Sequence, residues 1–195
     1  MLFRYLIMIS VMYISCFSFA QGRGGGGSKF SIGAMVLGGQ GKMGNGQTDA
    51  PDRDMFYIPV AFYAGFNIKK FRLGVNYEYS LTNQTTDPAT VASTNLSGTT
   101  NALGLRLEYY NGSQSIGAVY RASVSHALEK QTFLATSATY KGSGLSVQYM
   151  IQIKKKIGLV LDYTMDTYSD SLATGSIKSN RVGLGLVFAN FAGGK

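Results

Sequence analysis

The sequence contains no tryptophan, one histidine, one cysteine and three prolines. The cysteine, Cys16, lies in the first 20 residues, so a chain that loses this segment has no disulfide framework. With one histidine and scattered acids, the clusters of Cys and His that transition metals need are missing, and we expect no metal and no cofactor. Few prolines and 25 glycines argue against a collagen-like or disordered chain and favour β structure with tight turns.

Residues 1–20 have the layout of a secretory signal peptide. Arg4 supplies the positive charge, an apolar run follows, and Ser18 and Ala20 are the small residues before the cleavage point. The run has about 15 residues, fewer than the roughly 20 that a membrane-spanning helix needs. An uncleaved helix and a lipoprotein signal ending at Cys16 are the alternatives. Cleavage after Ala20 removes Arg4 and no acid, so the net charge changes from +8 to +7.

A glycine-rich tether, residues 21–28, follows the signal. The basic charge raises the possibility of nucleic-acid binding. However, the lysines at 69–70 and 154–156 lie in apparent tight turns and do not form a groove with stacking aromatics. Together with export, this argues against a nucleic-acid partner.

Eight segments then place apolar residues at every second position, which is the period of a β-strand. Each is about as long as the 9–11 residues that a tilted strand needs to cross a bilayer. The sequence therefore predicts an all-β fold, an eight-stranded antiparallel up-and-down transmembrane barrel over residues 29–191 with a tail at 192–195. The segments are 30–36, 56–66, 71–79, 103–109, 116–124, 145–153, 157–165 and 182–188.

The connections between these segments alternate in length, with short turns on one rim and long loops on the other. We expect periplasmic turns at 67–70, Asn111-Gly112 and Lys154-Lys155, and both termini on the same side. The extracellular loops are expected at 39–54, 82–99, 127–144 and 167–177, where residues 132–139 could instead extend a strand. Pro59 cannot donate to a strand ladder, so a bulge or a wide pair is expected there.

The apolar set is expected to face lipid, because its more than thirty members cannot fit inside an eight-stranded barrel. The opposite set is rich in glycine and polar residues, contains no lysine, and carries apolar exceptions such as Val119, Met150, Val160 and Val187. We expect it to face the lumen, with Ser123 on this face and Val124 on the lipid face.

Four arginines and four acids belong to the inward set, and buried charges must pair because an unpaired one costs several kcal/mol. We expect Arg72 to pair with Glu108 near the periplasmic mouth and Asp166 with Arg181 near the outer mouth. The middle of the lumen is expected to hold Arg106, Arg121, Glu78 and Asp162. A plug of salt bridges is the preferred interpretation, and a polar conduit is the alternative. The eight residues are Arg72, Glu78, Arg106, Glu108, Arg121, Asp162, Asp166 and Arg181.

The last strand ends with Val182, Leu184, Leu186 and Phe188, which look like the signal recognised by the outer-membrane assembly machinery. The mature chain resembles the small eight-stranded barrels of the OmpA, OmpX and OmpW type. It departs from them at the end, because residues 189–195 follow where these proteins usually finish on Phe. The resemblance implies a location in the outer membrane, in contact with its lipid and lipopolysaccharide.

A non-enzymatic role in surface interaction, adhesion or envelope integrity is the preferred function, with an unknown extracellular ligand bound by the loops. A narrow OmpW-like channel for small or hydrophobic solutes is the main alternative, and a lipid A-modifying enzyme is the third. We assign no catalytic residue, because Ser125 points away from His126 on a strand, and we expect His126 to be a polar rim residue. Acids at 49, 52 and 54 lack the spacing of an EF-hand calcium loop.

Overall fold

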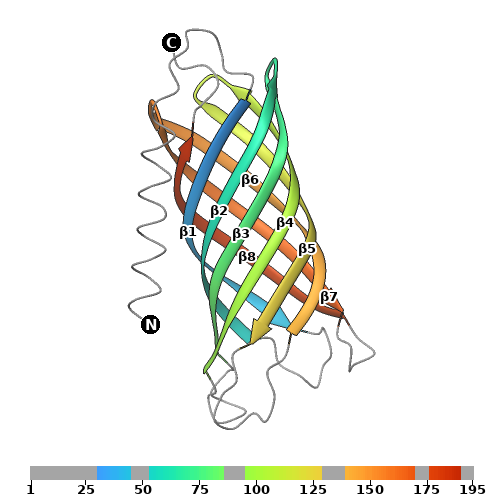
Figure 1. The fold of residues 1–195 in the computed structure, drawn as a ribbon. Coiled ribbons are helices and arrows are strands. Elements are labelled where there is room, and N and C mark those ends of the chain that lie inside the picture. The colour runs from blue at the N-terminus through green and yellow to red at the C-terminus, as the bar shows by residue number, and fades with distance from the viewer. Residues whose placement is uncertain (1–29, 45–52, 86–94, 129–138, 170–175, 190–195) are drawn as a thin grey trace.

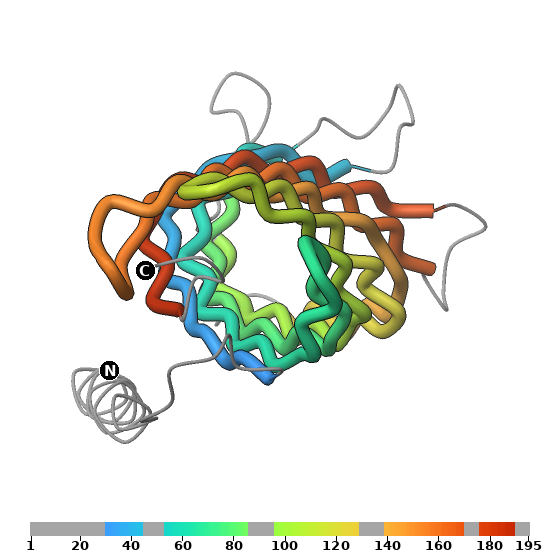
Figure 2. The backbone as a smooth tube through the Cα atoms, turned by 90° about the horizontal axis from the view of Figure 1, so that it is seen from above, coloured from blue at the N-terminus to red at the C-terminus, as the bar shows by residue number. Residues whose placement is uncertain are grey.

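The computed structural model describes residues 30–44, 53–85, 95–128, 139–169 and 176–189 as eight antiparallel strands in one closed barrel (Figure 1). Each strand pairs with its sequence neighbours, and β1 pairs with β8 to close the ring (Figure 2). The predicted fold class is confirmed. The strands are β1 (Phe30–Gly44), β2 (Arg53–Ile68), β3 (Phe71–Thr85), β4 (Asn95–Asn111), β5 (Gln114–Leu128), β6 (Thr139–Lys154), β7 (Ile157–Ser169) and β8 (Ser176–Ala189).

Several expected segments lie outside the described residues. These are the signal peptide at 1–20, the tether at 21–28, the tail at 192–195 and most of the possible strand extension at 132–139. Asp49 and Asp52 also fall there. None of the residues that the structure describes belongs to a helix long and apolar enough to cross a membrane.

Three two-residue turns connect the strands at one end of the barrel (Figure 1). They are Lys69-Lys70, Gly112-Ser113 and Lys155-Lys156. The second and third lie one residue later than the sequence indicated, because Asn111 pairs with Gln114 and Lys154 pairs with Ile157. Gly112 has φ of +64°, a left-handed conformation that glycine adopts without steric cost.

The strands are longer than expected, from 13 residues in β7 to 17 in β4. Parts of all four expected loops are strand: β1 continues to Gly44, β3 to Thr85 and β5 to Leu128. The sequence signal ended too early because apolar alternation marks only the part of a strand that lies in lipid. Backbone pairing continues beyond it, where the outward side chains are polar.

Alternation decides which side chains enter the barrel, and β7 shows it without interruption. Leu159, Leu161 and Tyr163 are exposed, whereas Val160 and Asp162 are buried. Over the described strands, 27 large hydrophobic side chains are exposed on the outer wall. A closed wall with so large an apolar surface is the surface of a membrane protein. The expected lipid face is therefore the outer wall.

A bulge in β5 corrects the expected parity. Leu103 pairs with Ser123 but Leu105 pairs with Tyr120, so β5 carries one extra residue between the two pairs. Because a bulge leaves one residue unpaired, every side chain beyond it changes face. Ser123, expected inside, is exposed, and Val124, expected against lipid, is buried in the lumen.

Pro59 interrupts pairing without a bulge. Between β1 and β2 the register is the same at Val36–Val60 and at Gly39–Tyr57, but no pair is formed between them. On the other side of β2, Pro59 pairs in register with Ser80. The missing N–H of proline accounts for a gap on one side of the strand only.

Candidate functional site

The barrel lumen is the candidate functional site, because it holds all eight charged residues that the sequence placed inside. All eight are buried, with side chains at most 9% exposed where an ion pair forms. They come from β3 (Arg72, Glu78), β4 (Arg106, Glu108), β5 (Arg121), β7 (Asp162, Asp166) and β8 (Arg181).

Arg72, Arg106 and Glu108 form the periplasmic network. Arg72 and Glu108 are directly opposite on β3 and β4, and Arg72 Nη1 lies 3.4 Å from Glu108 Oε2. Arg106, expected in the middle of the lumen, donates from Nε to the same oxygen at 3.0 Å. Ser115 Oγ donates to the second carboxylate oxygen at 2.7 Å. One carboxylate thus serves two cations, and this network has a formal charge of +1.

Arg121, Arg181, Glu78 and Asp166 form the outer network. Arg121 reaches both acids, with Nη1 at 2.6 Å from Glu78 Oε2 and Nε at 2.8 Å from Asp166 Oδ1. Arg181 Nη2 lies 2.6 Å from Asp166 Oδ2, and its Nη1 lies 3.6 Å from Glu78 Oε1. Two cations and two anions in a closed ring have no net charge. Bidentate geometry of this kind matches the planar guanidinium.

Asp162 differs from the other acids, because no cation of the described residues lies within 4.0 Å of it. Its carboxylate accepts hydrogen bonds from Ser146 Oγ, from Gln148 Nε2 at 2.9 Å and from Thr164 Oγ1 at 2.7 Å. Gln148 Oε1 in turn accepts from Arg106 Nη1. The Gln148 amide therefore connects Asp162 to the periplasmic network. The negative charge of Asp162 offsets the single positive charge of that network.

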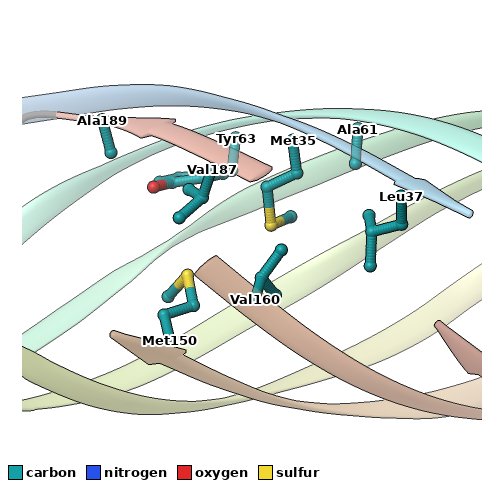
Figure 3. Close-up of a cluster of buried hydrophobic side chains, with 8 residues drawn as sticks. All are labelled: Met35, Leu37, Ala61, Tyr63, Met150, Val160, Val187 and Ala189. Carbon is teal, nitrogen blue, oxygen red and sulfur yellow. The ribbon is translucent and has the colours of Figure 1, made fainter. Parts of the chain in front are cut away.

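An apolar cluster fills the lumen beside these charges (Figure 3). Arg106 lies directly against it, with Nη2 at 3.7 Å from Met150 Sδ and the guanidinium carbon 4.4 Å from the Tyr63 ring centroid. Val160, Val187 and Met150 are fully buried members of this cluster, whereas Val119, the fourth apolar exception, is buried outside it. The cluster consists of Met35, Leu37, Ala61, Tyr63, Met150, Val160, Val187 and Ala189.

Glycines leave room for tyrosine rings to lie across the lumen. A Cβ atom on Gly39 would lie 2.6 Å from a ring carbon of Tyr57, and one on Gly183 would lie 2.7 Å from the Tyr57 hydroxyl. The Tyr57 ring carries the guanidinium of Arg181 at 5.0 Å, a cation–π distance. The inward glycines noted in the sequence thus allow aromatic side chains to fill the barrel.

His126, expected at the polar rim, is buried in the outer half of the lumen. The β5 bulge is the reason, because it turns His126 inward together with Val124. Its Nδ1 lies 2.8 Å from Thr100 Oγ1 and its Nε2 lies 2.8 Å from Gln84 Nε2. Neither neighbouring serine of β5 is among these partners.

Some polar atoms in the lumen have no hydrogen-bond partner within the described part of the chain. They include the Tyr57 hydroxyl, Asn76 Oδ1, Thr82 Oγ1 and Ser179 Oγ. Buried polar atoms of this kind are usually satisfied by ordered water. The lumen therefore contains buried polar atoms that can take an ordered water as hydrogen-bond partner, as well as closely packed apolar side chains.

The four residues of the expected assembly signal lie on β8, the strand that closes the barrel between β7 and β1. Val182, Leu184 and Leu186 are exposed on the outer wall, and Phe188 is half-buried. Their recognition by the assembly machinery stays a prediction.

Two solved structures share the barrel fold of this chain at low sequence identity. Neisserial surface protein A is 14% identical, with a TM-score of 0.56 over 86% of this chain and 100% of that one. The chain has the fold of the small eight-stranded outer-membrane barrels. The attachment invasion locus protein Ail of Yersinia pestis, in complex with the heparin analogue sucrose octasulfate, is 10% identical. Its TM-score is 0.50 over 82% of this chain and 98% of that one. No protein-family model and no curated protein matches the sequence.

Proposed function

We propose that the chain is a non-enzymatic barrel of the outer membrane that acts through its outward surface, in surface interaction, adhesion or envelope integrity. The observation that carries the proposal is the filled lumen. Paired charges and an apolar cluster occupy the interior that a channel or an active site would need.

The charge networks oppose ion passage for a physical reason. A permeating ion would have to displace a guanidinium from a carboxylate that is itself out of water. Breaking such a buried pair costs about 3–5 kcal/mol. The apolar cluster beside Arg106 adds a surface that does not hydrate an ion.

The surface role is supported by the strand ends beyond the apolar belt. They carry polar side chains to the side of the barrel opposite the three short turns. The two similar structures are those of a surface protein and of an attachment invasion locus protein, the second in complex with a heparin analogue. A polar rim formed by paired strands suits the positioning of loops for partner contact.

Conductance in planar lipid bilayers tests the proposal. We expect no stable conductance for the purified wild-type protein. Glu78→Ala should open a small one, because it leaves Arg121 and Arg181 with Asp166 alone. Ser169→Ala, on the exposed face of β7, is the control and should behave as wild type.

A narrow channel is the second candidate, favoured by the unpartnered polar atoms in the lumen. Hydrated positions near Tyr57 and Asn76 are what a polar conduit would need. A steady ohmic current from wild-type protein would replace the closed-barrel proposal with this one. An unchanged lipid A mass on expression is expected in both cases, whereas a changed mass would indicate an enzyme.

A further inference from the structure

Beyond the belt of exposed apolar side chains, the charge of the outer wall differs from one side of the barrel to the other. We define the outer rim as the outward-facing strand ends on the side opposite the short turns. On β3, β4 and β5 this rim is uncharged over the described residues, with Asn83, Thr85, Thr99 and Ser123 as examples. On β6, β8 and β1 it carries the exposed lysines Lys141, Lys178 and Lys42.

The three lysines lie on one side of the barrel because β6, β7, β8 and β1 are consecutive in the closed sheet. Lys42 is opposite Asn180, so Lys178 is its diagonal neighbour on the same face, at a distance of roughly 7–8 Å. Lys141 on β6 is opposite Ser169 on β7, and β7 in turn pairs with β8. Strands lie about 4.8 Å apart, which places Lys141 and Lys178 on the order of 12 Å from each other.

None of the three lysines has a carboxylate within 4.0 Å among the described residues. Asp54 is opposite Lys42 on β2 but does not pair with it at this distance. Like charges on diagonal positions repel one another. An external anion between Lys42 and Lys178 would remove this repulsion.

The height of these lysines favours a lipid over a soluble anion. On β8 the last apolar outward residue is Val182, and on β6 it is Leu145. Lys178 and Lys141 each lie two outward positions nearer the outer rim than these apolar residues. This is roughly 13 Å along the strand, or 9 Å along the membrane normal for a strand tilted by 45°. Lysine has a long, flexible stem that can bring its ammonium group back toward the headgroups.

We propose that Lys42, Lys141 and Lys178 form a binding surface for the phosphate groups of an outer-leaflet lipid, with phosphorylated lipid A as the occupant. The proposal rests on the outer-membrane placement proposed above. It goes beyond that placement by assigning lipid binding to one side of the barrel. The uncharged rim of β3 to β5 takes no part.

Native mass spectrometry of the full-length mature protein in detergent tests the proposal, with bisphosphorylated lipid A as the probe. The triple variant Lys42→Gln, Lys141→Gln, Lys178→Gln should bind lipid A at least tenfold more weakly. A basic residue near an anionic lipid surface contributes about 5-fold in affinity. Dephosphorylated lipid A with the same acyl chains should bind the wild type as weakly as lipid A binds the variant.

The matched control is Lys70→Gln, Lys154→Gln, Lys155→Gln, which removes the same charge from exposed residues in and next to the turns at the opposite end. It should keep wild-type lipid A affinity, and heat-modifiable gel migration should show both variants folded. An equal loss in the control would overturn the proposal, because net charge alone would then explain binding. The proposal would also be overturned if the wild type bound phosphatidylglycerol as tightly as lipid A, or if inorganic phosphate or sucrose octasulfate displaced lipid A. A barrel that conducts ions but shows the expected lipid pattern would overturn only the proposed function.

Discussion

Charge balance in the lumen depends on individual residues. Glu108 pairs with two arginines, and Arg121 pairs with two acids, so loss of either side chain removes an ion-pair partner from two other residues. Asp162 is held by three neutral donors and balances the periplasmic network only through Gln148. A single substitution therefore acts on several partners.

The pair formed by Arg72 and Glu108 gives the first prediction. Glu108→Ala alone should destabilise the barrel by about 3–5 kcal/mol, because Arg72 and Arg106 stay buried without their carboxylate. The double variant with Arg72→Ala should cost less than the sum of the two single changes. Urea unfolding in lipid vesicles measures all four proteins. Strict additivity would mean that the two side chains do not interact.

At the scale of single strands, depth in the membrane should decide tolerance to charge. Leu159 and Ser169 are both exposed outward on β7, one within the apolar belt and one at the outer rim. Leu159→Arg should cost roughly 2–4 kcal/mol and Ser169→Arg about 0–1 kcal/mol. Equal costs in a vesicle unfolding titration would contradict the assignment of the belt.

The number, order and outward face of the strands could be predicted from period-two alternation. Strand ends could not, because outward polar residues such as Lys178 and Ser169 look like loop residues in a sequence. The β5 bulge was missed for a different reason. Ala122-Ser123-Val124 keeps an apolar–polar pattern while one residue leaves the ladder, and the change of face is revealed by the pairing with β4 and β6.

The charged residues of the lumen could also be located by parity, since arginine and acid at inward positions are rare unless they pair. Their partners were harder to predict. Arg72–Glu108 followed from neighbouring strands, whereas the contact between Arg106 and Glu108 depends on side-chain conformation within β4. The inward position of His126 depends on the bulge, which the local sequence pattern does not indicate.

At the scale of the whole molecule, the barrel is apolar outside and charged within. The same alternation that covers the wall with leucine and tyrosine places arginine and carboxylate in the lumen. A soluble barrel of this size would have the reverse arrangement, with a smaller apolar set inside and lysine on its surface. The lipid face and the filled lumen are therefore two consequences of one pattern.

Site-specific fluorescence quenching tests this inside-out arrangement most directly. The only cysteine lies at position 16, so single-cysteine variants of the remaining chain need no background substitution. A fluorophore at Leu105→Cys or Leu159→Cys should be quenched by lipids with a quencher on the acyl chain. The same fluorophore at Ser146→Cys or Thr164→Cys, both buried in the lumen, should not be quenched. Quenching at the lumen positions with none at Leu105 and Leu159 would contradict the account.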